Sequence, residues 1–175
     1  MEKTLDKQFE ALFKRVESAL KSTLQEMPAP KDVVYVCGFW LFYNDYTTLG
    51  APAFAYNTVG NENVGKWSPP EWVVDVADHM AEALQPLYGE ITAFLAGKSD
   101  DEWNALIKYQ WDFYCQFCLA LNDKAKGGDG LFANWNLSDD FVVGIFDARQ
   151  GDELYETLIK SSVGEAQARS LGILQ

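Results

Sequence analysis

The sequence contains one histidine, His79, among its 175 residues. A single histidine excludes a metal site with two histidine ligands and restricts any Ser-His-Asp arrangement to one that uses His79 as its base. Positive charge is also scarce, because 14 lysine and arginine residues stand against 26 aspartate and glutamate residues, a net charge of −12. This balance disfavours nucleic acids and anionic membrane surfaces as partners, and it favours either a cationic partner or solubility alone.

Long apolar segments are absent as well, and we expect no secretory leader. No run of eighteen apolar residues occurs, so we expect no membrane-spanning helix. The residues from Met1 to Lys7 are charged and lack the apolar centre of a signal peptide. Three cysteines, at positions 37, 115 and 118, lie in apolar runs and cannot all pair with one another, which favours buried thiols in a reducing compartment. We therefore expect a cytoplasmic protein.

The residues that are present suffice for one well-filled core. Hydrophobic residues make up 48% of the chain and aromatic residues 14%, a composition that is typical of globular proteins rather than of disordered chains. A chain of this length forms one domain and buries a substantial core. We therefore expect a single domain over residues 1–175.

Apolar patterning predicts an N-terminal helix and several strands. Apolar residues recur every three or four positions over residues 4–26, which predicts an amphipathic helix. Residues 33–43 are β-branched and aromatic without polar interruption, which is typical of a central strand covered on both faces. Residues 51–57 predict a second, antiparallel strand, residues 141–147 a further one, and residues 131–135 are a weaker candidate.

A helix start is expected at Ser68. Ser68 as N-cap, Pro69 at the first helical position and Glu71 at the third have the pattern of a capping box. Trp67 and Trp72 occupy the two positions of a hydrophobic staple, so we expect them to fix the entry into this helix. The alternative is that they are aromatic anchors for a partner.

Further helix signals follow along the chain. Pro86 is expected to stop or kink the helix that starts at Ser68. Ser99 and Glu102 form a second capping-box pattern before a largely apolar helix, and Asp152 and Ser162 precede two short helices. Together these signals predict an α+β fold: an antiparallel sheet of three to four strands packed with about five to six helices in a single domain.

The acidic residues concentrate between residues 32 and 105, where two bases and eleven acids give a net charge of −9. On the expected helix, Asp75, Asp78, His79 and Glu82 recur at i, i+3, i+4 and i+7 and would share one face. They could bind a metal or act as an acid/base cluster, or they could form only a solvated face, which is the simpler interpretation.

Two other motifs have a functional and a structural interpretation. The Cys115-x-x-Cys118 spacing is found in redox and metal pairs, but here it falls in the middle of an aromatic helix and indicates core packing. The glycine-rich segment 127–130 lacks the Lys-Ser/Thr pair of a phosphate loop and follows a helix, which indicates a helix cap and turn. The loop from Gly60 to Gly65 is expected at the surface, where it could contact a partner or serve only as a connection.

Four segments in sequence carry a family resemblance. They are the aromatic strand of residues 35–43, the Asn-Thr pair at 57–58, the Trp-x-Pro-x-Glu-Trp segment at 67–72 and the apolar strand of residues 141–147. In this order they resemble a bacterial domain-of-unknown-function family of cytosolic α+β proteins. The resemblance implies similarity to the immunity proteins that are encoded beside secreted bacterial toxins and neutralise them by direct binding. It implies no catalytic residues.

We therefore expect a cytosolic binding protein, an immunity protein that neutralises a cationic toxin through an acidic surface, with no catalytic residues, metal or cofactor. The alternative is a small carboxylate-dependent enzyme with His79 and Asp75 or Asp78 in a cleft, and a scaffolding subunit with a large apolar surface is a third possibility. The sequence leaves the oligomeric state open. The residues expected at the interface are Glu62, Trp67, Glu71, Asp75, Asp78 and Glu82.

Overall fold

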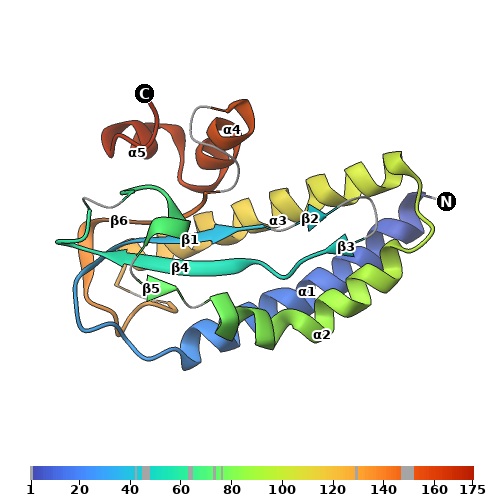
Figure 1. Cartoon of the computed structure of the whole chain (residues 1–175), viewed down its shortest axis with the longest axis horizontal. Helices are drawn as coiled ribbons and strands as arrows, with labels where there is room; N and C mark the ends of the chain where they lie inside the picture. The colour runs from blue at the N-terminus through green and yellow to red at the C-terminus, as the bar shows by residue number, and fades with distance from the viewer. Residues whose placement is uncertain are drawn as a thin grey trace.

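The computed structural model describes the backbone of residues 2–41, 43–44, 48–62, 65–72, 74–75, 77–128, 130–146 and 152–175. Within these ranges the side chains of residues 2–6, 43, 44, 70, 74, 75, 77 and 78 lie outside the description. The elements run in the order α1 (Glu2–Glu26), β1 (Val34–Trp40), β2 (Tyr43–Asn44), β3 (Thr48–Leu49), β4 (Ala53–Thr58), the 3-10 helix η1 (Pro69–Glu71), β5 (Val74–Asp75), α2 (Ala77–Leu95), α3 (Asp100–Lys126), β6 (Leu137–Ile145), α4 (Glu153–Ser162) and α5 (Glu165–Ser170) (Figure 1).

The main sheet has the strand order β5-β4-β1-β6. β1 pairs antiparallel with β4 and parallel with β6, and β5 adds only two residues at the outer edge of β4. The α+β class is confirmed, with five α-helices in the described part of the chain, but the expected antiparallel sheet is wrong because the sheet is mixed. β1, β4 and β6 are strands of ordinary length, whereas β5 has only two residues.

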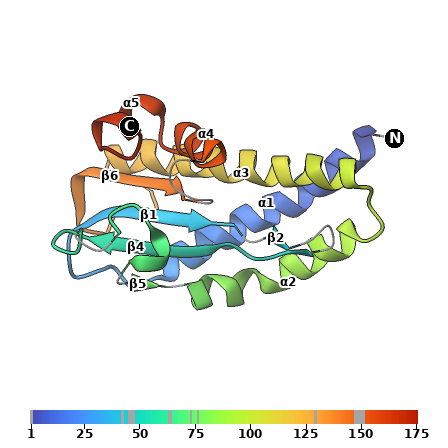
Figure 2. The same ribbon diagram turned by 45° about the horizontal axis from the view of Figure 1, so that its top comes forward.

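The parallel pairing of β6 follows from the helices that precede it. After β4 the chain passes through α2 and α3, which run in opposite directions, and returns to the end of the sheet at which β1 begins (Figures 1 and 2). A strand that starts there and lies beside β1 must run parallel to it. Local sequence patterns predict strands but not their neighbours, so this pairing could not be seen in them.

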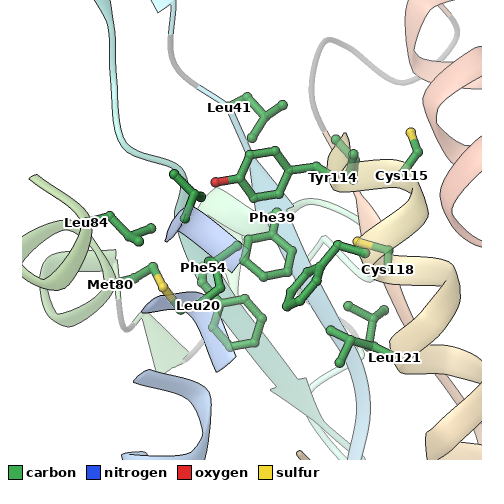
Figure 3. Packing of buried hydrophobic residues seen from close by; sticks show 14 of the residues in the cluster. Leu20, Phe39, Leu41, Phe54, Met80, Leu84, Tyr114, Cys115, Cys118 and Leu121 are labelled. Atoms are coloured by element: carbon green, nitrogen blue, oxygen red, sulfur yellow. The ribbon is translucent and has the colours of Figure 1, made fainter. Parts of the chain in front are cut away.

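Helices cover both faces of the sheet. α1, α2 and α3 pack on one face, and α4, α5 and the segment 65–72 lie on the other (Figure 2). The continuous apolar run of β1 is thereby explained, since β1 lies between β4 and β6 and is buried along almost its whole length, as expected. On the first face, the rings of the strands β1 and β4 lie among side chains of all three helices, as Phe39, Phe54, Leu20, Met80, Leu84, Tyr114 and Cys118 illustrate (Figure 3).

α3 is the central helix of that first face. The expected capping box is present, since the Ser99 side chain accepts from the backbone N–H of Glu102 and the Glu102 carboxylate accepts from the backbone N–H of Ser99. Cys115 and Cys118 are buried free thiols, and burial raises the pKa of both. A raised pKa suppresses the reactive thiolate, which agrees with a role in packing. None of the helices in the described part of the chain combines the length and apolarity needed to cross a membrane.

The expected helix start at Ser68 is wrong. Residues Pro69–Glu71 form one 3-10 turn, the Ser68 side chain makes no cap hydrogen bond, and Trp72 is extended with ψ of 149°. α2 begins only at Ala77, after β5. Because Trp72 is buried against Gly38 on the second face of the sheet, the chain stays extended there instead of continuing as a helix.

Two weaker expectations are also wrong, one of them only in part. At Pro86 we expected a stop or a kink, and the stop is wrong because α2 continues to Leu95. The proline is exposed, so the carbonyl group that loses its helical hydrogen bond can be solvated. The candidate strand at residues 131–135 forms turns instead, and its buried rings Phe132 and Trp135 pack on each other with centroids 4.9 Å apart.

The side chain of Asn122 ties α3 to the free edge of β6. Its amide oxygen accepts from the backbone N–H of Val143 at 2.7 Å, and its amide nitrogen donates to the carbonyl groups of Val143 at 2.9 Å and Ser162 at 3.1 Å. Two residues further along β6, the Ser162 hydroxyl accepts from the N–H of Ile145 at 3.1 Å and donates to the carbonyl of Leu158. These two buried side chains therefore satisfy the edge of β6 as a neighbouring strand would.

Replacing this amide tests its role. Asn122→Ala leaves the N–H and C=O of Val143 and the C=O of Ser162 without their partner in a buried site, at about 1–3 kcal/mol for each unsatisfied group. We expect the free energy of unfolding, measured by urea titration, to fall by about 3 kcal/mol or more. Asn104→Ala, at an exposed position of the same helix, should change it by less than about 0.5 kcal/mol, and equal effects of the two substitutions would contradict this role.

Candidate functional site

The segment after β4 is held on the sheet by Asn57. The Asn57 amide donates to the Tyr35 hydroxyl at 3.0 Å, and its oxygen accepts from the backbone N–H of Thr58 at 2.9 Å. The Tyr35 hydroxyl donates in turn to the backbone carbonyl of Lys66 at 3.0 Å. A buried strand residue is thereby connected to the far side of the loop, so the loop has a fixed position on the sheet.

Trp72 anchors the other end of the segment. Its indole N–H donates to the carbonyl of Gly65 at 3.2 Å, and its ring packs edge-on to Phe146 with centroids 5.4 Å apart. Gly38 allows this approach, because a Cβ there would lie 2.8 Å from both rings. At Gly65, where φ is +48°, a Cβ would collide with the Glu71 carboxylate, so the turn depends on glycine.

Trp67 lies between these anchors and is only half-buried. Its ring is stacked over Phe146 at 6.4 Å with an interplanar angle of 3°, and it meets Tyr35 edge-on at 5.8 Å. The expected helix staple with Trp72 is wrong, because both indoles pack on Phe146 instead. One side of Trp67 is therefore fixed by packing, and the rest is available at the surface.

A cavity of about 130 Å³ opens beside Trp67, which we call the Trp67 pocket. The loop, β1, the start of β6 and the C-terminal segment each contribute to it. Its volume is below the roughly 300–1000 Å³ of sites for drug-sized ligands. The pocket is therefore of the size of one long side chain. Its lining residues are Tyr35, Val59, Glu62, Lys66, Trp67, Ser138, Asp140 and Leu171.

Irregular strand pairing brings these residues together. In β1 the pairing shifts between Val34 and Val36, and this bulge places Tyr35 on the same face as Val36. On the other side of β1, Val34 pairs with Leu137 of β6 and Val36 pairs with Val142. Residues 138–141 of β6 therefore have no partner in β1. This unpaired stretch carries Ser138 and Asp140 to the pocket.

The pocket combines an aromatic wall with charges of both signs. The carboxylates of Glu62 and Asp140 line the pocket together with one ammonium group, that of Lys66. Glu62 accepts from the backbone N–H of Gly60 at 2.8 Å, which fixes the carboxylate on the loop. The Lys66 ammonium lies 5.0 Å from the ring centroid of Trp67 and 5.9 Å from that of Tyr35, within the range of cation–π attraction.

Two further features of the lining are suited to contact with a partner. Val59 is 52% exposed and is the one large hydrophobic side chain so exposed in the described part of the chain. The Ser138 hydroxyl is buried and has no hydrogen-bond partner among the described residues. A buried hydroxyl without a partner costs free energy, which a water or a ligand group reaching it would recover.

The structure unites two of the six expected interface residues in this pocket, Glu62 and Trp67. Glu71 is exposed on η1 beside the same loop, and Glu82 is exposed on α2. The side chains of Asp75 and Asp78 lie outside the described residues. Sequence reasoning missed the other six lining residues, Tyr35, Val59, Lys66, Ser138, Asp140 and Leu171. Of these, only Asp140 offered a signal, because it forms a pair of aspartates with Asp139 just before an apolar strand.

The shared helix face expected for Asp75, Asp78, His79 and Glu82 is not formed. Asp75 belongs to β5, whereas the other three belong to α2. His79 is exposed. Among the described side chains, no group of three or more His, Cys, Asp or Glu residues could hold a metal ion.

The hydroxyl of Tyr35 gives the site a testable pH dependence. Burial raises the pKa of Tyr35 to about 12, the nearby Glu62 charge acts in the same direction, and the hydrogen bond from Asn57 opposes them. In the unfolded chain the pKa is about 10. The neutral hydroxyl therefore stabilises the fold fully below pH 10, and this contribution is lost as the pH rises from about 10 to about 12.

We therefore expect Tyr35→Phe to be less stable than the wild type at pH 8, and the difference between them to narrow between about pH 10 and pH 12. Urea unfolding of both proteins at each pH measures it. The other tyrosines titrate in both proteins, so their effects cancel in the comparison. A difference that stayed constant or widened with pH would contradict the position of this hydroxyl.

Comparisons with known proteins found no relative of this chain. Neither the scan against protein-family models nor the searches of curated proteins and of solved structures finds a match for the chain. The expected likeness to toxin-neutralising proteins therefore stays a prediction from residues 35–147. The function has to be argued from the Trp67 pocket itself.

Proposed function

We propose that the chain is a cytosolic immunity-type protein that neutralises a cationic protein toxin by docking it on the Trp67 pocket. The observation that carries the proposal is the pocket's combination of an aromatic wall with two carboxylates in a cavity of about 130 Å³. An aromatic face and carboxylates both attract a cation, and the volume is that of a side chain rather than a metabolite.

A basic side chain of the partner fits this site best. Its charged end would meet the Glu62 and Asp140 carboxylates, while its aliphatic stem would lie along the Trp67 ring. Arginine suits it particularly, because a guanidinium group can stack on the indole and bind a carboxylate in the same plane. The half-buried indole in a fixed position is also the kind of residue that dominates binding energy at protein interfaces.

The surroundings support a protein partner. Val59 and Leu171 extend apolar surface from the pocket, as expected for the centre of an interface with a polar rim. The net charge of −12 on the whole chain would attract a cationic partner and raise the association rate. The exposed carboxylates of Glu71 and Glu82, with Asp75 and Asp78, belong to the acidic stretch of residues 32–105 and are proposed as interface residues on that ground.

The enzyme alternative has less support. It depended on His79 acting with Asp75 or Asp78 in a cleft, but His79 is exposed, and Asp75 belongs to β5 rather than to α2. The resemblance of residues 35–43, 57–58, 67–72 and 141–147 to immunity-type proteins favours binding. We therefore retain the binding function as the proposal.

Reversing the two pocket charges tests the proposal. The chain is immobilised, basic proteins are captured from a lysate of the cells that naturally make it, and each captured protein is purified for binding measurements. We expect the Glu62→Lys/Asp140→Lys variant to bind the partner about tenfold more weakly, a loss of about 1.4 kcal/mol, with a smaller dependence on salt. Co-production of the wild-type chain, but not of this variant, should restore growth to cells that make the partner.

The matched control is Glu10→Lys/Asp101→Lys, which makes the same charge change. These two exposed residues lie towards the N-terminal ends of α1 and α3, at the end of the molecule opposite β5 (Figure 1). The control should bind and protect as the wild type does. If both variants bound the partner equally weakly, the effect would be one of overall charge and not of the pocket. If the pocket variant bound as the wild type does, the proposed role of the pocket would be refuted.

Lys66 provides an independent prediction. Its ammonium already occupies the aromatic wall, so a partner's basic group has to displace it. We expect Lys66→Gln to strengthen partner binding by a few-fold, because the competing cation is gone. Lys98→Gln is the control, since the Lys98 ammonium lies 4.9 Å from the Phe94 ring outside the pocket and its loss should leave the affinity unchanged. Weaker binding by Lys66→Gln would show that Lys66 contacts the partner instead.

A further inference from the structure

A second cavity lies between α1 and α3, two of the helices that cover the first face of the sheet. It has a volume of about 430 Å³ and is closed at one end by the turn at Gly130 and Leu131. This volume falls within the roughly 300–1000 Å³ of small-molecule sites, unlike that of the Trp67 pocket. No element of the proposed function uses it.

The two helices diverge at this cavity. Near their N-terminal halves they are joined by ring contacts, Phe13 with Tyr109 at 5.4 Å and Phe13 with Phe113 at 4.9 Å. Further on, α1 crosses obliquely to α3 (Figure 2), and the cavity is lined by Lys21 on one side and Leu121 on the other. The cavity is therefore a groove between two helices that the ring contacts of Phe13 hold together at one end.

The floor of the groove is apolar and aromatic. Phe113, Phe117 and Leu121 of α3 line it, and Leu131 adds to the closed end. Gly130, with φ of +88°, lets the turn lie against α3, since a Cβ there would come within 3.0 Å of the Lys124 Cβ. The turn and the aliphatic stem of Lys124 therefore form a tight wall beside the apolar floor.

The charge at the rim is positive although the whole chain is strongly acidic. The Lys21 ammonium is paired with the Glu17 carboxylate at 2.5 Å, so this pair is neutral. No carboxylate in the part of the chain with described side chains lies within ion-pair distance of the Lys124 ammonium. Among the described side chains, the groove thus presents one cation without an ion-pair partner above an apolar floor.

We infer that this groove binds a small amphipathic anion, a carboxylate with an alkyl chain. The chain would lie along Phe117 and Leu121, and the carboxylate would pair with the Lys124 ammonium at the rim. Burial of the alkyl chain supplies the affinity, and the single charge sets the orientation and the preference for an anion. The site is separate from the Trp67 pocket and does not depend on the proposed function.

Binding of dodecanoate to the full-length chain tests the inference. The titration is followed by calorimetry and by NMR shifts of the Phe113 and Phe117 rings, below the concentration at which dodecanoate forms micelles. We expect saturable binding of one molecule per chain, and weaker binding of dodecyltrimethylammonium, which has the same chain and the opposite charge. Equal binding of the two probes, or uptake without saturation, would overturn the inference.

Two substitutions locate the site. Lys124→Glu should weaken dodecanoate binding about tenfold or more by placing a negative charge at the rim. Ala120→Phe should weaken it by filling the groove, since Ala120 is an exposed lining residue of α3. Lys108→Glu makes the same charge change on α3 outside the groove and should have no effect. Binding that both groove variants leave unchanged would overturn the site, with a thermal melt confirming that each variant is folded.

Discussion

The hydrogen bonds of Asn122 at the free edge of β6 hold the two helical layers in place. Asn122 belongs to α3, on one face of the sheet, and it also bonds to the carbonyl of Ser162 at the end of α4, on the other. Three elements far apart in sequence therefore share one buried amide. Because the same groups satisfy β6 as a further strand would, the sheet can end there without exposing an edge that invites pairing with another chain.

Local patterns predicted most of the long helices and strands but not how these elements assemble. The amphipathic period of α1, the buried run of β1 and the capping box of α3 are properties of neighbouring residues, and they were predicted correctly. The parallel pairing of β6 depends on where α2 and α3 return the chain, which no local pattern encodes. At Ser68 a good helix-start signal was overridden because burial of Trp72 against Gly38 keeps the following chain extended.

The residues of the Trp67 pocket also fall into some that local patterns predicted and others that depend on the assembly of the sheet. Glu62 and Trp67 were accessible to sequence reasoning, because both lie in the segment that follows a predicted strand, which is a local feature. Tyr35 reaches the pocket only through the bulge in β1, and Asp140 only through the unpaired stretch of β6. Both are irregularities of pairing, so the site appears only once the register of the sheet is known.

Those irregularities also explain why the pocket is suited to binding. Tyr35 and Trp72 fix the two sides of the loop through hydrogen bonds to backbone carbonyls, and Phe146 supports the Trp67 ring from beneath. A loop held in this way loses little conformational entropy when a partner docks, so more of the contact energy appears as affinity. Under the proposed function, a basic group of the partner would have to displace the Lys66 ammonium from the aromatic wall. The pocket would then select for a partner whose basic group binds better than the protein's own lysine.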